Sequence, residues 1–195
     1  LGRLDQAIAI SEFLLIRDPV NVFGGYELAT SYYYAGRLDE AIATYRNDIR
    51  LFPTVTGDHE MIGEVLLVKG DARAALAEIK LEPSEPLRLT GLSMAYHALG
   101  QRAESDAALA ELIEKYEKTM AWNIALVLAF RNEADQAFAW LNKAIEYQDP
   151  TVGSTGLYPL LTNLHSDPRW LPFLRKNGMA PEQLAAIKFD VTVPK

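Results

Sequence analysis

The sequence predicts an all-α fold in which short helix pairs stack into a solenoid. Its main support is an internal repeat: residues 2–9 read GRLDQAIA and return 34 residues later, at 36–43, as GRLDEAIA. Asp18-Pro19, which follows the first copy, returns as Phe52-Pro53. A period of 34 residues built from two short helices is typical of stacked-repeat proteins. Such proteins usually bind other proteins and rarely carry out chemistry themselves.

Turn residues continue the repeat beyond the second copy. Gly70 lies 34 residues after Gly36, and Gly100 and Asn132 then follow at spacings of 30 and 32. Glycine at such a position suits the residue after a helix, which often needs a positive φ. At most two short strands are expected. We expect helices near residues 5–17, 22–35, 39–51, 57–69, 72–81, 86–99, 101–116, 119–131 and 134–147.

Small residues recur where the two helices of a pair would cross. Bulk there would push the helix axes beyond the usual spacing of about 8–10 Å. The first helices carry Ala29, Gly63, Ser93 and Ala125 at this position, and the second helices carry Ala7, Ala41, Ala75, Ser105 and Ala137.

Proline and aspartate mark the expected helix ends. Pro19 and Pro53 should stop the second helix of their repeats, because proline disfavours helix for the residue before it. Asp39 is expected to act as the N-cap of the helix at 39–51. Pro150 ends the last repeat, and residues 151–156 read as a flexible Gly/Ser/Thr loop.

The end of the chain is expected to form a helical cap on the solenoid. Pro168 would open one helix, with Ser166 or Asp167 as its N-cap. Asn177-Gly178 would stop it, and a last short helix would run from about 181 to 188. The apolar side chains that fold back onto the repeats are Leu160, Leu161, Trp170, Phe173 and Leu174.

The repeat resembles the tetratricopeptide repeat (TPR) family over residues 1 to about 148. The shared pattern is a first helix with Leu- and Tyr-type positions, a turn glycine, a second helix with small residues, and a closing proline. The resemblance implies a right-handed α-solenoid followed by a helical cap and tail at 149–195. It would comprise a half repeat at 1–21 and repeats at about 22–55, 56–84, 85–117 and 118–148.

The tail that begins at Asp167-Pro168-Arg169-Trp170 is similar to the C-terminal TPR regions of bacterial multidomain regulators such as class III adenylate cyclases. That resemblance implies a protein-interaction or regulatory scaffold module within a larger signalling protein. Such a module would bind a protein, a peptide or another domain of the same chain. Two alternatives are an oligomerisation module and the C-terminal part of a cyclase-type enzyme whose catalytic domain precedes Leu1.

The first residues suggest a fragment. Leu1-Gly2 reads as the turn of a repeat whose first helix is missing. The helix at 5–17 would then show Ile8, Leu14 and Leu15 to nothing upstream, and we expect another molecule to cover this patch. A homodimer through this open helix is one such arrangement.

Composition argues against several other classes of protein. Net charge is −7 and basic residues are scattered, so no footprint for nucleic acid is visible. There is no cysteine, hence no disulfide framework. No signal pattern is visible, and the apolar run at 121–130 is too short to span a bilayer. We expect a cytoplasmic protein without membrane contact.

No catalytic, cofactor or metal site is expected within these residues, and the chain is not expected to be an enzyme. His59, His97 and His165 lie in different repeats without metal-ligand spacing. Residues 153–156 contain neither a nucleophile elbow nor a phosphate-binding loop. Glu60 and Glu64 share a helix face, but such pairs are usually solvated.

The TPR resemblance also implies a peptide-binding groove on the concave face. Its positions are rich in aromatic residues and contain no Lys or Arg, which favours an apolar or aromatic peptide over an acidic C-terminal one. Alternatively, the rings pack between repeats, or residues 189–194 lie along the groove. The groove positions are Phe23, Tyr26, Thr30, Tyr33, Tyr34, Glu60, Glu64, Met94, His97, Trp122, Leu126 and Phe130.

Overall fold

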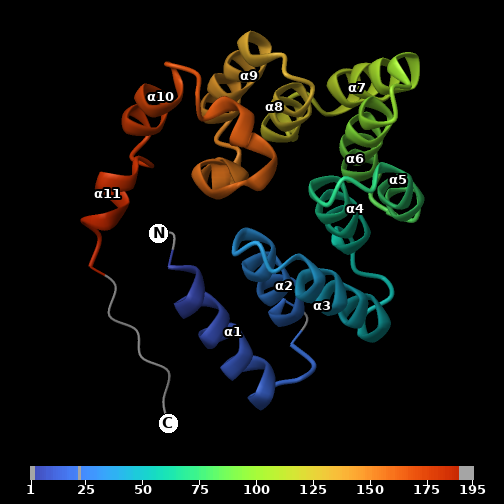
Figure 1. The fold of residues 1–195 in the computed structure, drawn as a ribbon, viewed down its shortest axis with the longest axis vertical. Coiled ribbons are helices and arrows are strands. Elements are labelled where there is room, and N and C mark those ends of the chain that lie inside the picture. Colours follow the sequence, from blue (N-terminus) through green and yellow to red (C-terminus); the bar gives the residue numbers. More distant parts are fainter. Residues whose placement is uncertain (1–2, 22, 189–195) are drawn as a thin grey trace.

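A computed structural model describes residues 3–21 and 23–188 as paired helices that stack into a curved solenoid (Figure 1). It contains no strand over those residues, and each repeat helix begins and ends within two residues of its predicted bounds. The repeat helices are α1 (Leu4–Arg17), α2 (Gly24–Tyr34), α3 (Leu38–Leu51), α4 (Asp58–Val68), α5 (Ala72–Ile79), α6 (Glu85–Ala98), α7 (Arg102–Tyr116), α8 (Ala121–Phe130) and α9 (Ala134–Glu146).

The turn residues adopt the left-handed conformation that the repeat predicts. Gly36, Gly70 and Gly100 have φ values of 75°, 80° and 73°. Asn132 takes the same role in the last repeat with a φ of 62°. Asparagine tolerates this region better than most residues with a Cβ, which explains why it can replace glycine here. Gly2, the equivalent turn residue of the first copy, lies outside the described residues.

Small residues allow the close helix crossings, as expected. Ala29 and Ala41 are fully buried in α2 and α3. Between α6 and α7 the same positions are serines that exchange hydrogen bonds: Ser93 Oγ donates to the carbonyl of Ser105 over 3.0 Å, and Ser105 Oγ donates to the carbonyl of Ser93 over 2.7 Å. At Gly63 of α4, an added Cβ would lie 2.3 Å from Cγ1 of Ile79.

Two expected caps differ in the structure. α3 begins at Leu38, so Asp39 lies inside its first turn and pairs with Lys69 instead of capping the helix. Pro168 does not open a helix either. Asp167 accepts a hydrogen bond from the backbone N–H of Arg169 over 2.9 Å, and this turn delays the helix until Trp170.

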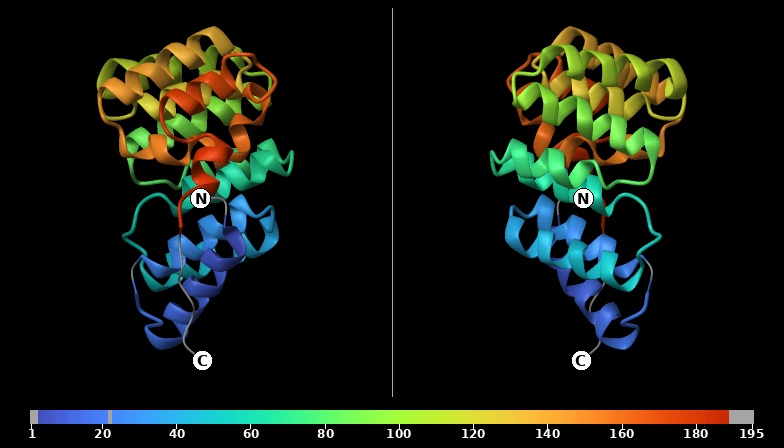
Figure 2. Two further views of the ribbon diagram at one scale, coloured as in Figure 1. Left: turned by 90° about the vertical axis from the view of Figure 1, so that its left-hand side faces the viewer. Right: turned by 90° about the vertical axis from the view of Figure 1, so that its right-hand side faces the viewer.

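The last part of the chain forms short helical elements that turn back across the solenoid (Figure 2). Residues 151–156, expected to be a flexible loop, belong to a 3₁₀ helix in which Val152 and Thr155 are buried. The elements are η1 (Pro150–Leu157), η2 (Pro159–Leu164), α10 (Trp170–Lys176) and α11 (Pro181–Ala185).

The solenoid curls until its two ends approach each other (Figure 1). Arg3 Nη2 donates to the carbonyl of Ile187, just after α11, over 2.9 Å. Ile8 is buried, whereas Leu14 and Ile16 of α1 are 50% and 80% exposed. The uncovered apolar part of α1 is therefore restricted to its C-terminal half. No helix in the described part of the chain is both long and apolar enough to cross a membrane.

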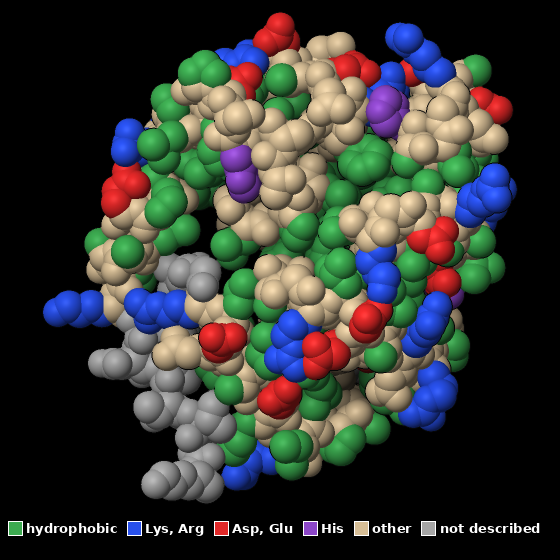
Figure 3. All heavy atoms as spheres, in the orientation of Figure 1, with side chains coloured by type: hydrophobic (Ala, Val, Ile, Leu, Met, Phe, Trp, Pro, Cys, Tyr) green, Lys and Arg blue, Asp and Glu red, His purple; other side chains and the backbone are tan. Residues whose placement is uncertain are grey.

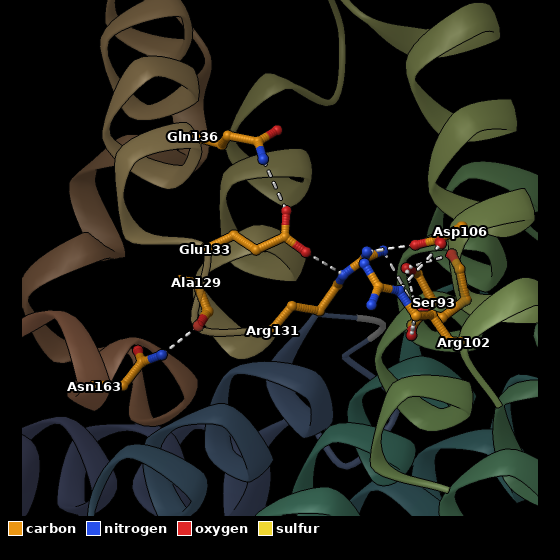
Figure 4. Close-up of polar contacts among 9 residues, drawn as sticks. Ser93, Arg102, Asp106, Ala129, Arg131, Glu133, Gln136 and Asn163 are labelled. Atoms are coloured by element: carbon orange, nitrogen blue, oxygen red, sulfur yellow. Dashed lines mark hydrogen bonds and ion pairs between the residues drawn. The ribbon is translucent and has the colours of Figure 1, made fainter. Parts of the chain in front are cut away.

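The side chain of Arg131, which is 7% exposed, connects α7, the end of α8 and the start of α9 (Figure 4). Arg131 follows α8, donates to Asp106 of α7, and donates through Nε to Glu133 before α9 over 2.8 Å. Close by, Asn163 of η2 donates to the carbonyl of Ala129 and to the side chain of Asn132. These contacts hold η2 against the end of α8.

Candidate functional site

Residues 150–164, here called the closing segment, pack against the repeats: η2 lies against α8 and α4, and η1 lies against α9. Tyr158 stands at the centre of the segment. Its ring centroid is 4.6 Å from that of Trp122, 5.7 Å from that of Tyr34 and 6.0 Å from that of Tyr33, all in edge-to-face geometry. The chain itself therefore fills much of the concave face.

Trp122 belongs to this internal packing. Its side chain is 1% exposed, and its Nε1 donates to Thr155 Oγ1 over 2.9 Å. Its backbone N–H donates to Asp149 Oδ2 over 3.1 Å. Both partners flank or belong to the closing segment, so the ring holds the segment in place and has little surface left for a ligand.

A cavity of about 390 Å³ remains open between the closing segment and the repeats. This volume is at the lower end of the range for ligand pockets. Hydrophobic side chains are visible on this face of the molecule near α4, α6 and α8 (Figure 3). The walls include Tyr26, Thr30 and Tyr34 of α2, Glu60 and Met61 of α4, Leu87 of α6, Trp122 and Asn123 of α8, and Tyr158.

Glu60 and Glu64 are buried, so the expectation that they are solvated is wrong. Glu60 is 3% exposed, and Glu64 is fully buried. Tyr158 Oη donates to Glu64 Oε2 over 2.6 Å. The two carboxyl groups contact each other, and beyond this contact the Oε1 atoms of both glutamates have no hydrogen-bond partner in the described structure. Burial raises the pKa of Glu64 to about 7, and burial together with the neighbouring Glu64 raises the pKa of Glu60.

A second buried acidic group lies at the start of α4. Neither carboxylate oxygen of Asp58 has a hydrogen-bond partner among the described residues. Burial, followed by the charges of Asp48 and Glu82, raises the pKa of Asp58 to about 7. Across residues 3–21 and 23–188, no group of three or more His, Cys, Asp or Glu side chains could hold a metal ion.

Glu82, which precedes α6, is buried in a different way. Its carboxylate accepts the backbone N–H groups of Gly57 over 3.0 Å, Glu60 over 3.4 Å and Ser84 over 2.9 Å. Two of these donors belong to the N-terminus of α4, where N–H groups lack partners within the helix. Glu82 thus acts as a cap for α4, supplied from a distant part of the chain.

The structure brings some of the predicted groove residues together and separates others. Tyr26, Thr30, Tyr34, Glu60 and Trp122 meet around the cavity. Tyr33, Glu64, Met94 and Leu126 are fully buried beneath the concave face. Phe23 is 76% exposed outside the cavity, and His97 and Phe130 pack against each other away from it with centroids 6.0 Å apart.

Leu160 and Leu161 of the closing segment were expected to fold back onto the repeats and are buried, but the role of Tyr158 and the helical form of the segment were missed from the sequence. The segment has neither the repeat period nor a helical pattern. The apolar run Leu157–Leu161, with the sequence LYPLL, was a usable signal. Such a run after the last repeat has to be buried somewhere, and the concave face was available. Residues 189–194, the other candidate occupant, lie outside the described residues.

Solved structures share this fold. A crystal structure of MamA matches 75% of this chain and 90% of its own chain with a TM-score of 0.52 and 20% identity. MamA from Desulfovibrio magneticus RS-1 matches 75% and 86% of the two chains with a TM-score of 0.52 and 14% identity. YrrB, described as a TPR protein with an unusual peptide-binding site, matches over 75% of this chain and 79% of its own chain, with a TM-score of 0.47 and 21% identity.

No protein-family model matches the chain, and no curated protein sequence is significantly similar to it. At 14–20% identity, the similarity to the MamA structures concerns the fold alone. Together with the 34-residue period and the left-handed turn residues, it establishes an all-α solenoid of stacked helix pairs.

Proposed function

We propose that this chain is a protein-binding scaffold that receives an extended segment of a partner protein in the concave cavity. The observation that carries the proposal is the wall of tyrosine rings, Tyr26, Tyr34 and Tyr158, around an open volume of about 390 Å³. Tyrosine is a frequent interface anchor because it buries a large surface at a modest entropic cost. The cavity is open beside the closing segment, so a partner can enter without displacing that segment.

The charge of the cavity argues against one class of ligand. Among the described residues, its lining contains Glu27, Glu60 and Asp149 but no Lys, Arg or His. An acidic peptide would have to bring further negative charge next to buried carboxylates, at a large electrostatic cost. The ligand we propose is therefore apolar, aromatic or basic where it enters the cavity.

Selection of peptides on the immobilised protein tests the proposal. Peptides selected by the wild-type protein should lose about 1–3 kcal/mol of affinity for the Tyr26→Ala variant, because an interface anchor is removed. Phe23→Ala is the matched control, since Phe23 is an exposed ring outside the cavity. Thermal melting should confirm that both variants fold. Failure to select peptides, or equal losses for both variants, would contradict the proposal.

A second candidate role is self-association through α1. Leu14 and Ile16 expose large apolar side chains, and Val20 just after the helix does so as well. Such a strip is commonly covered by another molecule. Light scattering over a range of protein concentrations should then show dimers that Ile16→Glu abolishes. A monomer at every concentration would exclude this role.

We also propose that the module serves a larger bacterial signalling protein. The support is the tail from Asp167 to Trp170, which is similar in sequence to the C-terminal parts of such regulators. The gene sequence upstream of the codon for Leu1 tests this directly. A cyclase, kinase or transcription-regulator domain in the same reading frame would support the proposal, and a stop codon or an unrelated domain would refute it.

A further inference from the structure

We propose that the cavity binds a basic side chain, Lys or Arg, of the partner segment, with Glu60 as its anionic contact and tyrosine rings as its walls. The inference rests on the proposed function and adds the chemistry of the anchor. It joins two features of the cavity: a buried carboxyl group without a partner of opposite charge, and a set of rings around an open volume.

The first argument is the buried carboxyl group of Glu60, which has no partner of opposite charge. The side chain is 3% exposed and lines the cavity, and its Oε1 has no hydrogen-bond partner in the described structure beyond the neighbouring carboxyl group of Glu64. Removing a carboxylate from water costs several kcal/mol unless a cation or hydrogen-bond donors compensate. The other buried acid of the cavity wall is already compensated, because Asp149 accepts the backbone N–H groups of Trp122 and Thr151 over 3.1 and 3.0 Å.

The second argument is the aromatic lining. Tyr34 and Tyr158 meet with their centroids 5.7 Å apart, and Tyr26 stands edge-on against Tyr45 at 5.7 Å. Aromatic faces attract organic cations, and the attraction grows when water is excluded. The methylene stem of Lys or Arg can also pack along the rings and Leu87 while its charged end reaches inward.

Neither a metal ion nor a neutral side chain would complete this cavity equally well. The described acids do not form a metal-binding group of three or more ligands. A neutral apolar side chain would leave Glu60 with an unpaired buried charge, or protonated. A basic side chain satisfies the carboxylate and the rings at the same time, which accounts for both observations with one ligand.

The surroundings of Glu60 predict a proton linkage. Burial and Glu64 raise the pKa of Glu60, and none of the titratable groups that interact with it is basic. A bound cation favours the ionised carboxylate, so binding should release protons, and affinity should rise with pH over the range in which the free protein still holds the Glu60 proton. The interacting groups are Glu64 on α4, Glu82 before α6, Tyr26, Tyr33 and Tyr34 on α2, and Tyr158 in the closing segment.

Peptide selection followed by substitution tests the inference. Peptides selected on the wild-type protein from a random library should share one Lys or Arg. Replacing that residue with norleucine, which keeps the stem and removes the charge, should weaken binding about tenfold or more at pH 8. The Glu60→Gln protein should bind both peptides with similar affinity. Glu104→Gln, an exposed glutamate of α7 outside the cavity, is the matched control and should keep the full difference.

Further measurements make each outcome decisive. Glu60→Gln should fold, because it removes a buried charge, and a urea melt confirms this. Tyr26→Leu should weaken binding of the basic peptide about three- to tenfold through the lost cation–ring contact, whereas Tyr26→Phe should not. The wild-type affinity should also increase from pH 6 to pH 8.

Three outcomes would overturn the inference. If selected peptides share no basic residue yet bind through Tyr26, the scaffold function stands and the basic anchor is refuted. If no peptide is selected, both proposals fail together. If free spermidine displaces the selected peptide and binds as tightly as it does, the cavity is a site for a free amine and not for a protein side chain.

Discussion

Glu82 and Glu60 are both buried glutamates beside the first turn of α4, yet their surroundings differ completely. Glu82 accepts three backbone N–H groups, from Gly57, Glu60 and Ser84. The Oε1 of Glu60 accepts none from the described residues and lies next to a second carboxyl group, that of Glu64. The first arrangement is complete within the fold, whereas the second lacks a partner of opposite charge.

The difference separates an acid that stabilises the fold from one that is available for binding. A buried polar group normally has its hydrogen-bond partners, and an exception calls for an explanation. Glu82 follows the rule, so removing it should harm the protein. Glu60 is an exception to the rule, so neutralising it should raise the free energy of unfolding and lower the affinity for the proposed ligand. Such opposite signs are expected where a site is held at the expense of stability.

The largest effect on folding is expected for Glu82→Ala. The substitution leaves buried N–H groups at the start of α4 without an acceptor, so the free energy of unfolding should fall by about 2–4 kcal/mol. Glu82→Gln is the matched control, because its amide oxygen still accepts hydrogen bonds, and its loss should be clearly smaller. Urea denaturation measures both. Equal losses would show that the cap does not explain the burial of Glu82.

The second-largest effect is expected in the pH dependence of the free energy of unfolding. Glu60 and Glu64 have pKa values raised in the folded state, so the unfolded chain releases their protons at lower pH. Stability should therefore be unaffected below about pH 4.5, the ordinary pKa, and should fall as pH rises towards 7 and above. Glu60→Gln should flatten this dependence and gain about 1–3 kcal/mol at pH 8. Urea melts at pH 5 and pH 8 would contradict this if the variant showed no gain at the higher pH.

Asp58→Asn should also raise the free energy of unfolding at pH 8, but by less than Glu60→Gln does. The pKa of Asp58 is raised to about 7, so its charge destabilises the fold at pH 8 and not at pH 4. Asp58 also lies in the first turn of α4, where a negative charge is favoured by about 0.3–1 kcal/mol. The two effects oppose each other, and the net gain should be about 1 kcal/mol at pH 8. A loss of stability at pH 8 would mean that the favourable effect of a negative charge at the N-terminus of α4 exceeds the cost of burying that charge.

The smallest effect is expected for Glu40→Gln. Glu40 is an exposed residue of α3 whose carboxylate pairs with Arg37 one turn earlier. Exposed pairs of this kind contribute little, because water and salt screen them. The urea midpoint should match that of the wild type at both pH values. A clear shift of the urea midpoint would show that an exposed acidic residue also affects stability. It would then be less certain that burial is what distinguishes the acidic residues of α4.

Most of the fold could be predicted from the sequence because its signals are local. α1 ends two residues before Pro19 and α3 ends two residues before Pro53. Gly36 adopts the positive φ that its place after a helix requires. Each of these features depends on a few neighbouring residues, so a repeat of 34 residues shows them again and again.

The candidate site could be predicted only in part because its cover comes from far along the chain. Tyr26 and Tyr34 were identified as concave positions, and both line the cavity. Glu60 and Glu64 were expected to be solvated, since nothing near them in the sequence indicates burial. The residue that covers Glu64 is Tyr158, 94 residues away, in a segment without periodicity. No local pattern encodes such a contact.

That contact between Tyr158 and Glu64 also bears on how the chain folds. In an open stack, each repeat touches only its neighbours, so such a protein can unravel from one end and its stability is a sum over adjacent units. Here the closing segment joins the middle of the stack to its end, and Arg3 reaches the carbonyl of Ile187 across 184 residues. Closing loops of this length costs entropy before any contact repays it, which slows folding relative to an open stack. The same closure makes the unfolding of distant repeats depend on one another, so the solenoid behaves as a single cooperative unit.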